Sequence, residues 1–343
     1  MSSQRTSPSK SGDMPKRDFK EALEPAVPHL ARIPTLARFF LVVVTSLIGS
    51  SVLFTLTSSL TVGDLGLVSK HLEEWWEVAG LVVWRVVEVG LPWALGFDSW
   101  DVASFLYLTH LPTYSLLTFF YGVRPTSALV SYAITVFSIV IPFFFLRSPA
   151  SVHDLSHAPS GAVANRAILQ DRPTTIYTTL AATSIFTVVL YASYASWLPT
   201  QLVVHFESIP DISAAHAGPA GLPVLFLTLI PSGYAVRDFL FVSSTGHSTH
   251  GTGEDSLPVD HESQYVVVSI YCRTIGQLSA KTRILASRTF VLAASVLLNT
   301  IVQLAGTVQS ISVQGAFLWG SVWAFATLAI GGLFSWVEAV PGV

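Results

Sequence analysis

The sequence has few charged residues for a chain of its length. Only 11% of its 343 residues are Asp, Glu, Lys or Arg, whereas 51% are hydrophobic. In an ordinary soluble domain, roughly a quarter of the residues are charged. A soluble fold with so little charge would lack the polar surface to cover its core, so the composition indicates a membrane protein.

Cysteine and catalytic sequence motifs are also scarce. Cys272 is the only cysteine, which excludes an intrachain disulfide and a thiolate cluster for zinc or iron–sulfur. The chain has no Gly-x-Ser-x-Gly elbow, no His-Glu-x-x-His, no phosphate-binding loop and no Rossmann fingerprint. The net charge is −3, and no basic face suggests nucleic acid. We therefore predict no catalytic residues, no cofactor and no nucleic-acid partner, and the balance is against an enzyme.

Long apolar stretches recur from residue 37 to the C-terminus. Each is about twenty residues long, the length that a helix needs to cross roughly 30 Å of hydrocarbon. Uninterrupted runs such as Phe143–Phe145 favour helices over the alternating strands of outer-membrane proteins. The sequence therefore predicts an all-α, polytopic transmembrane helix bundle. Eight spans are expected, at 37–60, 77–97, 103–122, 126–147, 174–197, 222–241, 286–307 and 313–337.

The remaining segments give the domain organisation. Residues 1–34 contain five prolines and many serines, which predicts a disordered cytosolic tail. Residues 35–343 are expected to form a single transmembrane domain with cytosolic loops at 148–173 and 242–285. Lys and Arg gather in the tail and in these two loops, whereas the other loops hold very few. This bias predicts that both termini face the cytosol.

The sequence gives weaker signals for the membrane and the partners. The first apolar run begins too late for a cleavable signal peptide, and acidic residues in the tail are untypical of a mitochondrial presequence. An internal eukaryotic membrane such as the endoplasmic reticulum is preferred, ahead of the mitochondrial inner membrane. The lipid bilayer is the one expected partner, and a protein partner or oligomer stays open.

The second span carries a charged stripe. Glu74, Glu77, Leu81, Arg85 and Glu88 recur at steps of three and four residues and share one helical face. Because an ionisable group at membrane depth costs about 2.5 kcal/mol or more, this face should turn into the bundle. The stripe predicts the wall of a polar pathway, a structural ion pair, or an interfacial helix that would leave seven spans.

Two further ionisable residues lie inside predicted spans. His110 precedes Pro112 and could relay a proton or make an interhelical hydrogen bond. Asp238 follows the sequence Pro231–Gly233, which predicts a kinked or discontinuous helix of the kind that often borders a binding site. Together with Arg85 and Glu88, these two residues are the candidates for a substrate or ion pathway.

A polar cluster precedes the sixth span. The side chains of His205, Glu207, Asp211 and His216 are all of types that bind divalent metals. Their spacing is irregular, so they are weak candidates and no metal is predicted.

Two segments resemble stretches in a group of uncharacterised fungal multipass membrane proteins. They are LVVHFESIPDISAA at Leu202–Ala215 and HLEEWWEVAGLVVWR at His71–Arg85. The resemblance covers most of the chain after the tail. It implies a membrane protein and supplies no activity or binding residue.

Three functions follow from these patterns. The first is transport or sensing of a small solute or ion through a polar interior, which requires a hydrated cavity lined by Arg85 and Glu88. The alternative is a structural or assembly protein of an internal membrane, in which these charges pair in a dry contact. The third is a membrane-embedded lipid-modifying enzyme, which requires the polar residues of 205–216 to meet.

Overall fold

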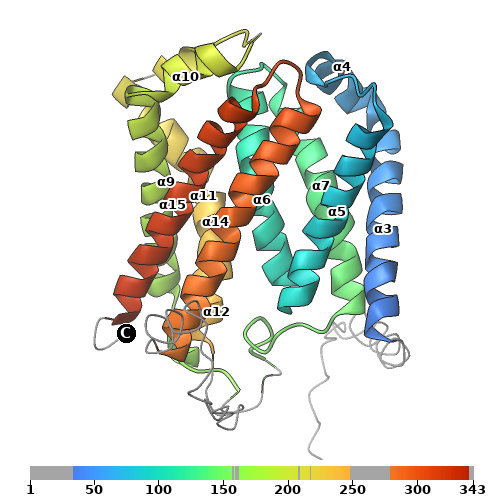
Figure 1. Ribbon diagram of the computed structural model, residues 1–343. Helices are drawn as coiled ribbons and strands as arrows, with labels where there is room; N and C mark the ends of the chain where they lie inside the picture. Colours follow the sequence, from blue (N-terminus) through green and yellow to red (C-terminus); the bar gives the residue numbers. More distant parts are fainter. Residues whose placement is uncertain are drawn as a thin grey trace, which may run out of the picture.

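The computed structural model describes residues 34–156, 158, 162–207, 209–216, 218–247 and 279–339, and the structural statements below concern this part of the chain. Nearly all of the predicted tail and most of the predicted 242–285 loop lie outside it. Helix labels follow Figure 1.

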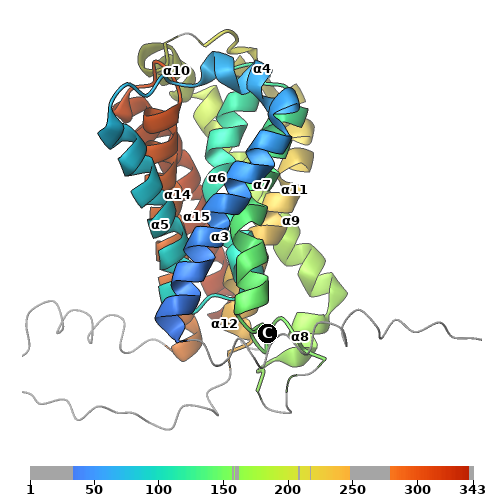
Figure 2. The same cartoon turned by 90° about the vertical axis from the view of Figure 1, so that its right-hand side faces the viewer.

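Long helices run side by side through the molecule and alternate in direction (Figures 1 and 2). Three short helices cover the ends: α4 (Ser58–Val68), α8 (Arg166–Gln170) and α10 (Leu198–His205). The described residues form no strand, only three isolated bridges. The long helices are α3 (Thr35–Leu56), α5 (Trp75–Leu95), α6 (Ser99–Phe119), α7 (Pro125–Leu146), α9 (Arg172–Ala195), α11 (Leu222–Arg237), α14 (Ala280–Thr307) and α15 (Val313–Ala339).

The architecture is an all-α transmembrane helix bundle, as the sequence predicts. By length and composition, six of the described helical segments are apolar enough to cross a membrane: α3, α7, α9, Gly218–Thr245, α14 and α15. The other two long helices, α5 and α6, carry ionisable residues such as Arg85 and His110 and run between the apolar ones (Figure 1). The segment 77–97 thus lies along the bundle and not across its end.

Local chemistry sets where several helices begin. The carboxylates of Asp98 and Asp171 and the hydroxyl of Ser279 accept hydrogen bonds from backbone N–H groups in the first turns of α6, α9 and α14. These caps satisfy N–H groups that a helix start leaves unpaired. The predicted start of the seventh span, residue 286, was six residues late, because the polar first turn after Ser279 is helical but not apolar.

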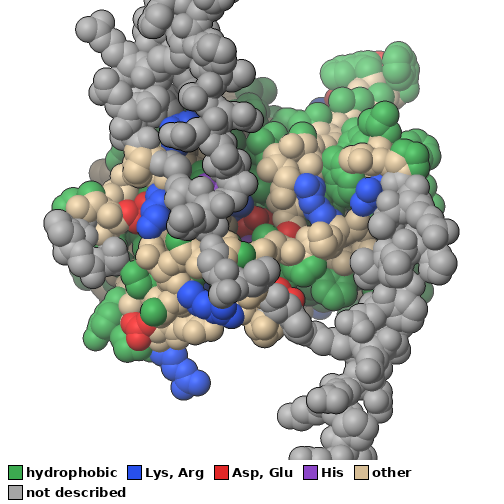
Figure 3. All heavy atoms as spheres, turned by 90° about the horizontal axis from the view of Figure 1, so that it is seen from below, with side chains coloured by type: hydrophobic (Ala, Val, Ile, Leu, Met, Phe, Trp, Pro, Cys, Tyr) green, Lys and Arg blue, Asp and Glu red, His purple; other side chains and the backbone are tan. Residues whose placement is uncertain are grey.

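The two ends of the bundle differ in charge. The end at which α3 begins and α15 ends is called here the basic end, and Figure 3 shows Lys and Arg side chains on it. Residues at the basic end include Arg147, Arg166 and Arg283, whereas the opposite end has Lys70 and Arg124. Among the described residues, the two ends therefore differ in their share of Lys and Arg.

Glycines bring neighbouring helices into close contact, as the small-residue pattern of a membrane protein allows. A Cβ atom on Gly331 of α15 would lie 2.3 Å from the Thr289 side chain of α14, and one on Gly233 of α11 would lie 2.1 Å from that of Thr183 of α9. The neighbouring Gly332 faces open space. Specific glycines, and not every glycine of these helices, therefore set the helix crossings.

The sixth predicted span, which was expected to be kinked or discontinuous at Pro231–Gly233, is not interrupted there. Helix α11 passes through Pro231 without interruption to Arg237. The irregular part follows, as a π-helical turn η3 (Asp238–Val242) and a short helix α12 (Ser243–Thr245). Such π turns are frequent at functional sites, and this one places Asp238 at its first position.

Candidate functional site

Three helices bring predicted charges together in the middle of the bundle. On α5, Arg85 Nη1 lies 3.2 Å from Glu88 Oε2, the pair that their spacing predicted. From α6, His110 Nε2 lies 3.0 Å from Glu88 Oε1. Arg85 also donates to the Ser138 hydroxyl at 2.6 Å and to the Thr135 carbonyl at 3.2 Å, both on α7. Arg85, Glu88 and His110 thus form one cluster, called here the mid-bundle network.

Asn299 of α14 extends this network and sets the tautomer of its histidine. The indole N–H of Trp84 can only donate, and it donates to Asn299 Oδ1 at 2.9 Å. Asn299 Nδ2 therefore faces His110 Nδ1 at 3.2 Å and the Thr109 carbonyl at 3.0 Å. His110 Nδ1 must accept this hydrogen bond, so the ring is neutral and its single proton on Nε2 faces Glu88.

The side chains of the mid-bundle network are buried. The side chains of Arg85, Glu88 and His110 are 15%, 7% and 3% exposed. With a neutral His110 the two charges cancel, and both have protein partners. Removing one partner of a buried pair leaves an uncompensated charge, whereas replacing the whole pair by apolar groups is often neutral. This arrangement suits a structural contact and lacks the free, hydrated group that a proton relay or an anion site needs.

A second polar cluster lies at the basic end, where a tight turn joins α5 to α6. Gly96 closes α5 with φ +83°, a left-handed conformation that glycine adopts without strain. Two residues later, Asp98 Oδ1 accepts from the Asp101 amide at 2.9 Å and caps α6. The turn thereby presents both carboxylates to the segments that pack over the basic end.

The loop after α7 is held on Asp98 by a histidine. Asp98 Oδ2 accepts from the Ala150 amide at 2.9 Å and lies 2.8 Å from His153 Nδ1. Burial favours a neutral Asp98, but its hydrogen bond from His153 outweighs burial and lowers the pKa of Asp98 below its ordinary range. Burial likewise opposes the charged imidazole, yet Asp98, with Asp101 and Asp238 near it, raises the pKa of His153. The pair is therefore a charged clamp on the loop.

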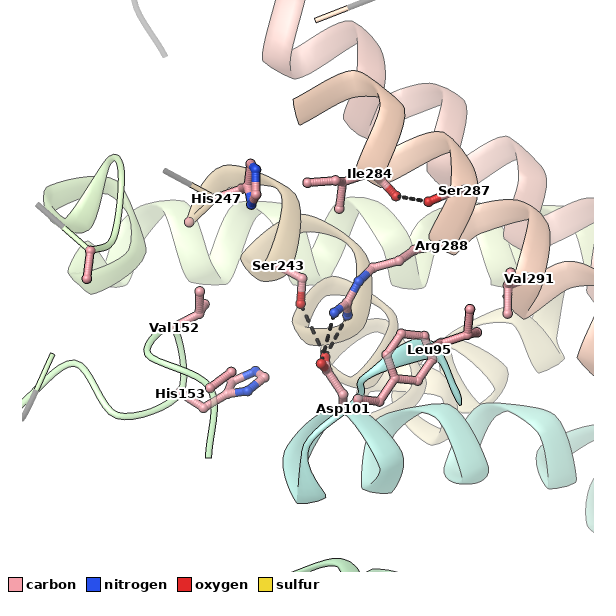
Figure 4. Close-up of a pocket in the computed structure, with 14 residues that line it drawn as sticks. Leu95, Asp101, Val152, His153, Ser243, His247, Ile284, Ser287, Arg288 and Val291 are labelled. Carbon is pink, nitrogen blue, oxygen red and sulfur yellow. Dashed lines mark hydrogen bonds and ion pairs between the residues drawn. The ribbon is translucent and has the colours of Figure 1, made fainter. Parts of the chain in front are cut away.

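Arg288 of α14 neutralises the second carboxylate. Its Nη1 and Nη2 lie 2.7 and 2.9 Å from the two oxygens of Asp101, and Ser243 adds a hydrogen bond at 3.2 Å (Figure 4). The guanidinium also stacks over the rings of Phe97 and Phe239 at 4.8 and 5.0 Å. This bidentate, aromatic-backed geometry fits arginine and would not suit lysine.

The predicted Asp238 belongs to the basic-end cluster. Its Oδ2 accepts from Ser104 at 3.3 Å and lies 3.9 Å from His153 Nε2. Ser104 is six residues before His110 on α6, about 9 Å along the axis, so the structure does not bring Asp238 to the mid-bundle network. The adjacent Arg237 donates to the Thr175 hydroxyl at 3.0 Å.

His153 separates two cavities at the basic end. Its side chain is 7% exposed and its buried Nε2 has no hydrogen-bond partner. One cavity, of about 600 Å³, also contains Asp101, Ser243 and Arg288 (Figure 4). The other, of about 620 Å³, contains Ser104 and Asp238. Neither cavity is lined by Arg85, Glu88 or His110.

Asp98, Asp101 and His153 are the described group with metal-binding side chains close together. One ligand atom of each lies within 4.8 Å of the others. Their atoms are already engaged, however: Asp101 holds Arg288 bidentately, and Asp98 holds two backbone amides and His153. A guanidinium at this position also opposes a cation. The geometry suits an ion-pair cluster better than a metal centre.

The weak metal candidates near the opposite end do not form a group of three or more among the described residues. His205 lies 3.2 Å from the Ser312 hydroxyl, Asp211 caps Ser213, and His216 faces the Ile212 carbonyl. Glu207 hydrogen-bonds through its backbone amide to Ser310. The arrangement on which the lipid-enzyme hypothesis depends is therefore not present.

Sequence reasoning identified the three residues of the mid-bundle network but missed Asn299 beside it. At the basic end it identified Asp238 but missed Asp98, Asp101, His153 and Arg288. Asp98 could have been found, because Asp-x-x-Asp before an apolar run is an N-cap signature. His153 and Arg288 carry no local signal, since each meets its partner only after helices distant in sequence pack together. The same holds for Asn299, which lies 189 residues from His110 along the chain.

Comparison with known proteins gives one family. Residues 171–302 match the Bouquet formation protein 3 C-terminal domain. The match covers less than half of the chain and includes α9, α11 and most of α14, with Arg237, Asp238, Arg288 and Asn299. No curated protein and no solved structure matches the chain.

Proposed function

We propose that this chain is a structural protein of a membrane assembly, whose helix bundle holds its shape through buried ion pairs and does not conduct a solute. The mid-bundle network carries this proposal. Its charges cancel, both have partners on neighbouring helices, and its histidine is fixed in a neutral form by Asn299. A pathway would need at least one of these groups to face water.

The matched family also supports a structural role. Its name refers to bouquet formation and not to a solute or a reaction. We further propose that the basic end faces the cytosol, which places both termini there, because Lys and Arg favour the cytosolic side. An internal membrane such as the endoplasmic reticulum remains the proposed location.

The experiment replaces the whole network by apolar residues. In cells that lack the native gene, the variant R85M/E88M/H110M should restore both the protein's abundance in membranes and the phenotype of the deletion. Methionine fills irregular space and needs no partner, so the bundle should tolerate the exchange. The single variant R85M is the control, since it leaves Glu88 buried without its guanidinium and should lower abundance.

The contrary result is a triple variant that is folded and as abundant as the wild type but fails to complement. In that case the charges themselves would perform the function, and the pathway hypothesis would replace the structural one.

The basic end supports a second proposal, proton sensing by His153 and Asp238. The observation that favours it is the unpartnered Nε2 of His153, which lies between two cavities and 3.9 Å from Asp238. Protonation of His153 at Nε2 would give an N–H group that faces the Asp238 carboxylate. The pH experiment in the Discussion tests this proposal independently of the mid-bundle network.

A further inference from the structure

A third cavity lies at the opposite end of the bundle and differs in character from the two at the basic end. Its volume is about 680 Å³, in the range of pockets that hold small organic ligands. Helices α9 and α11 form its walls, and α10 with the two 3₁₀ turns Ser213–His216 and Gly218–Gly221 borders it near the end of the bundle.

The lining of this cavity is mainly apolar and contains no Asp, Glu, Lys or Arg. Phe119, Pro199, Val224 and Leu225 supply hydrocarbon surface. Apart from the imidazole of His216, a ligand with a phosphate or an ammonium group would find no side chain of opposite charge there, and transferring its charge out of water would be costly. The lining therefore selects against charged headgroups and favours an uncharged ligand.

One buried polar group in the cavity lacks a partner. Tyr194 is 8% exposed, and its buried hydroxyl makes no hydrogen bond. The ring is fixed by stacking against Trp319 at a centroid distance of 6.5 Å and by an edge contact with Phe120 at 6.0 Å. Because the ring cannot turn away, its hydroxyl stays in place, and a buried hydroxyl without a partner is unfavourable.

The cavity borders the surface that should face lipid. Val224 and Thr228 lie one turn apart on α11 and are exposed, Val224 by 65%. Around them the exposed side chains are apolar, including Leu227 of α11 and Val203 of α10. A ligand that enters past Val224 would therefore come from the bilayer and not from water.

We propose that this cavity binds a neutral lipid with a hydroxyl or carbonyl group, which hydrogen-bonds to Tyr194 while its hydrocarbon part lies between α9 and α11. A sterol and an acylglycerol share this chemistry. This site is independent of the proposed structural role of the mid-bundle network, which lies nearer the bundle centre.

The test uses the purified full-length protein with two photoreactive, alkyne-tagged probes, a sterol and a diacylglycerol. Wild-type protein should be labelled saturably, in the peptide that contains Tyr194, and unlabelled lipid of the same kind should compete. The probe that labels the protein shows whether the ligand is a sterol or an acylglycerol. Y194F keeps the ring and removes the hydroxyl, so labelling at a sub-saturating concentration should fall about tenfold, the value of one hydrogen bond.

Two tryptophan variants form a matched pair. V224W should obstruct the entrance and abolish labelling, whereas L227W, on the same helix and equally exposed at 64%, does not line this cavity and should label as the wild type does. Melting temperature gives a second measurement. Lipid should raise the Tm of the wild type and of L227W, and it should raise that of Y194F less at the same concentration, because Y194F binds more weakly. The unliganded form of Y194F should be no less stable than the wild type.

The proposal would be overturned by labelling that does not saturate, which indicates bulk lipid only. Equal labelling of wild type, Y194F and V224W would also overturn it.

Discussion

The two buried histidines of this bundle, His110 and His153, each lie against a carboxylate but differ in what the second ring nitrogen meets. In the mid-bundle network, Asn299 Nδ2 lies 3.2 Å from His110 Nδ1, and Glu88 Oε1 lies 3.0 Å from His110 Nε2. At the basic end, His153 Nδ1 pairs with Asp98 while Nε2 has no partner. We call the first site closed, because Glu88 Oε1 lies 3.0 Å from the second ring nitrogen, and the second site open, because the Asp238 carboxylate oxygen lies 3.9 Å from that nitrogen. The predictions below test this difference, from the largest expected effect to the smallest.

The largest effect should come from breaking the closed site. E88Q keeps the shape of the side chain but leaves Arg85 buried without a counter-charge, and loss of one partner of a buried pair costs about 3–5 kcal/mol. Thermal unfolding in detergent should show a large fall in Tm. D64N is the control, because Asp64 pairs with the exposed Arg124 at the opposite end and should change Tm little. Equal Tm values for E88Q and the wild type would mean that Arg85 is hydrated.

A smaller effect is expected where α15 crosses α14 beside the basic-end cluster. G331A places a methyl group against Thr289, the residue after Arg288, and overpacking of this kind costs about 1–3 kcal/mol. G332A adds the same methyl group into open space and should be neutral within about 0.5 kcal/mol. Unfolding measurements on this adjacent pair separate close packing from helix propensity. Similar losses in both variants would contradict the crossing described.

The smallest effect should be the pH dependence of the open site. The raised pKa of His153 means that its contribution to stability is complete below its ordinary pKa of 6.5 and is lost as pH rises through the raised value. The lowered pKa of Asp98 means that its contribution is present above 3.8 and is lost as pH falls through the lowered value. The clamp therefore stabilises the fold between these two limits.

Tm measured from about pH 5.5 to about pH 9 should show this window. The difference between wild type and H153Q should be largest at low pH and shrink as pH rises. The other charged groups that face His153 are those of Asp101, Asp238 and Arg288. If the Tm difference between wild type and H153Q did not change with pH, the contribution of His153 would come from its shape and not from its charge.

The sequence predicted the bundle well because apolar length and helical period are local properties. All eight expected spans fall on helices, and the spacing of Arg85 and Glu88 alone predicted their ion pair. The short end helices α4 and α10 were missed, because neither is long enough to appear as a span. Of the two alternatives predicted at Pro231, a kinked or a discontinuous helix, the discontinuous one was wrong, since a proline inside a helix can be tolerated when neighbouring groups adjust.

The sites were less predictable for a physical reason. Sequence patterns indicate which residues must avoid lipid but not which distant residue satisfies them. His110 and Asp238 were identified as candidates, yet their environments depend on Asn299 and His153, from other segments. Those partners decide whether the site around a buried histidine is closed or open.

The most direct test of the closed site is its exclusion of water. In a chain whose Cys272 has been replaced by serine, S138C would place a thiol beside Arg85, and S243C would place one in the basic-end cavity beside Asp101. In open membrane fragments, a water-soluble thiol reagent should label S243C and leave S138C unreacted until the protein is unfolded. Labelling of S138C in the folded protein at a rate like that of S243C would contradict the account, because water would then reach Arg85.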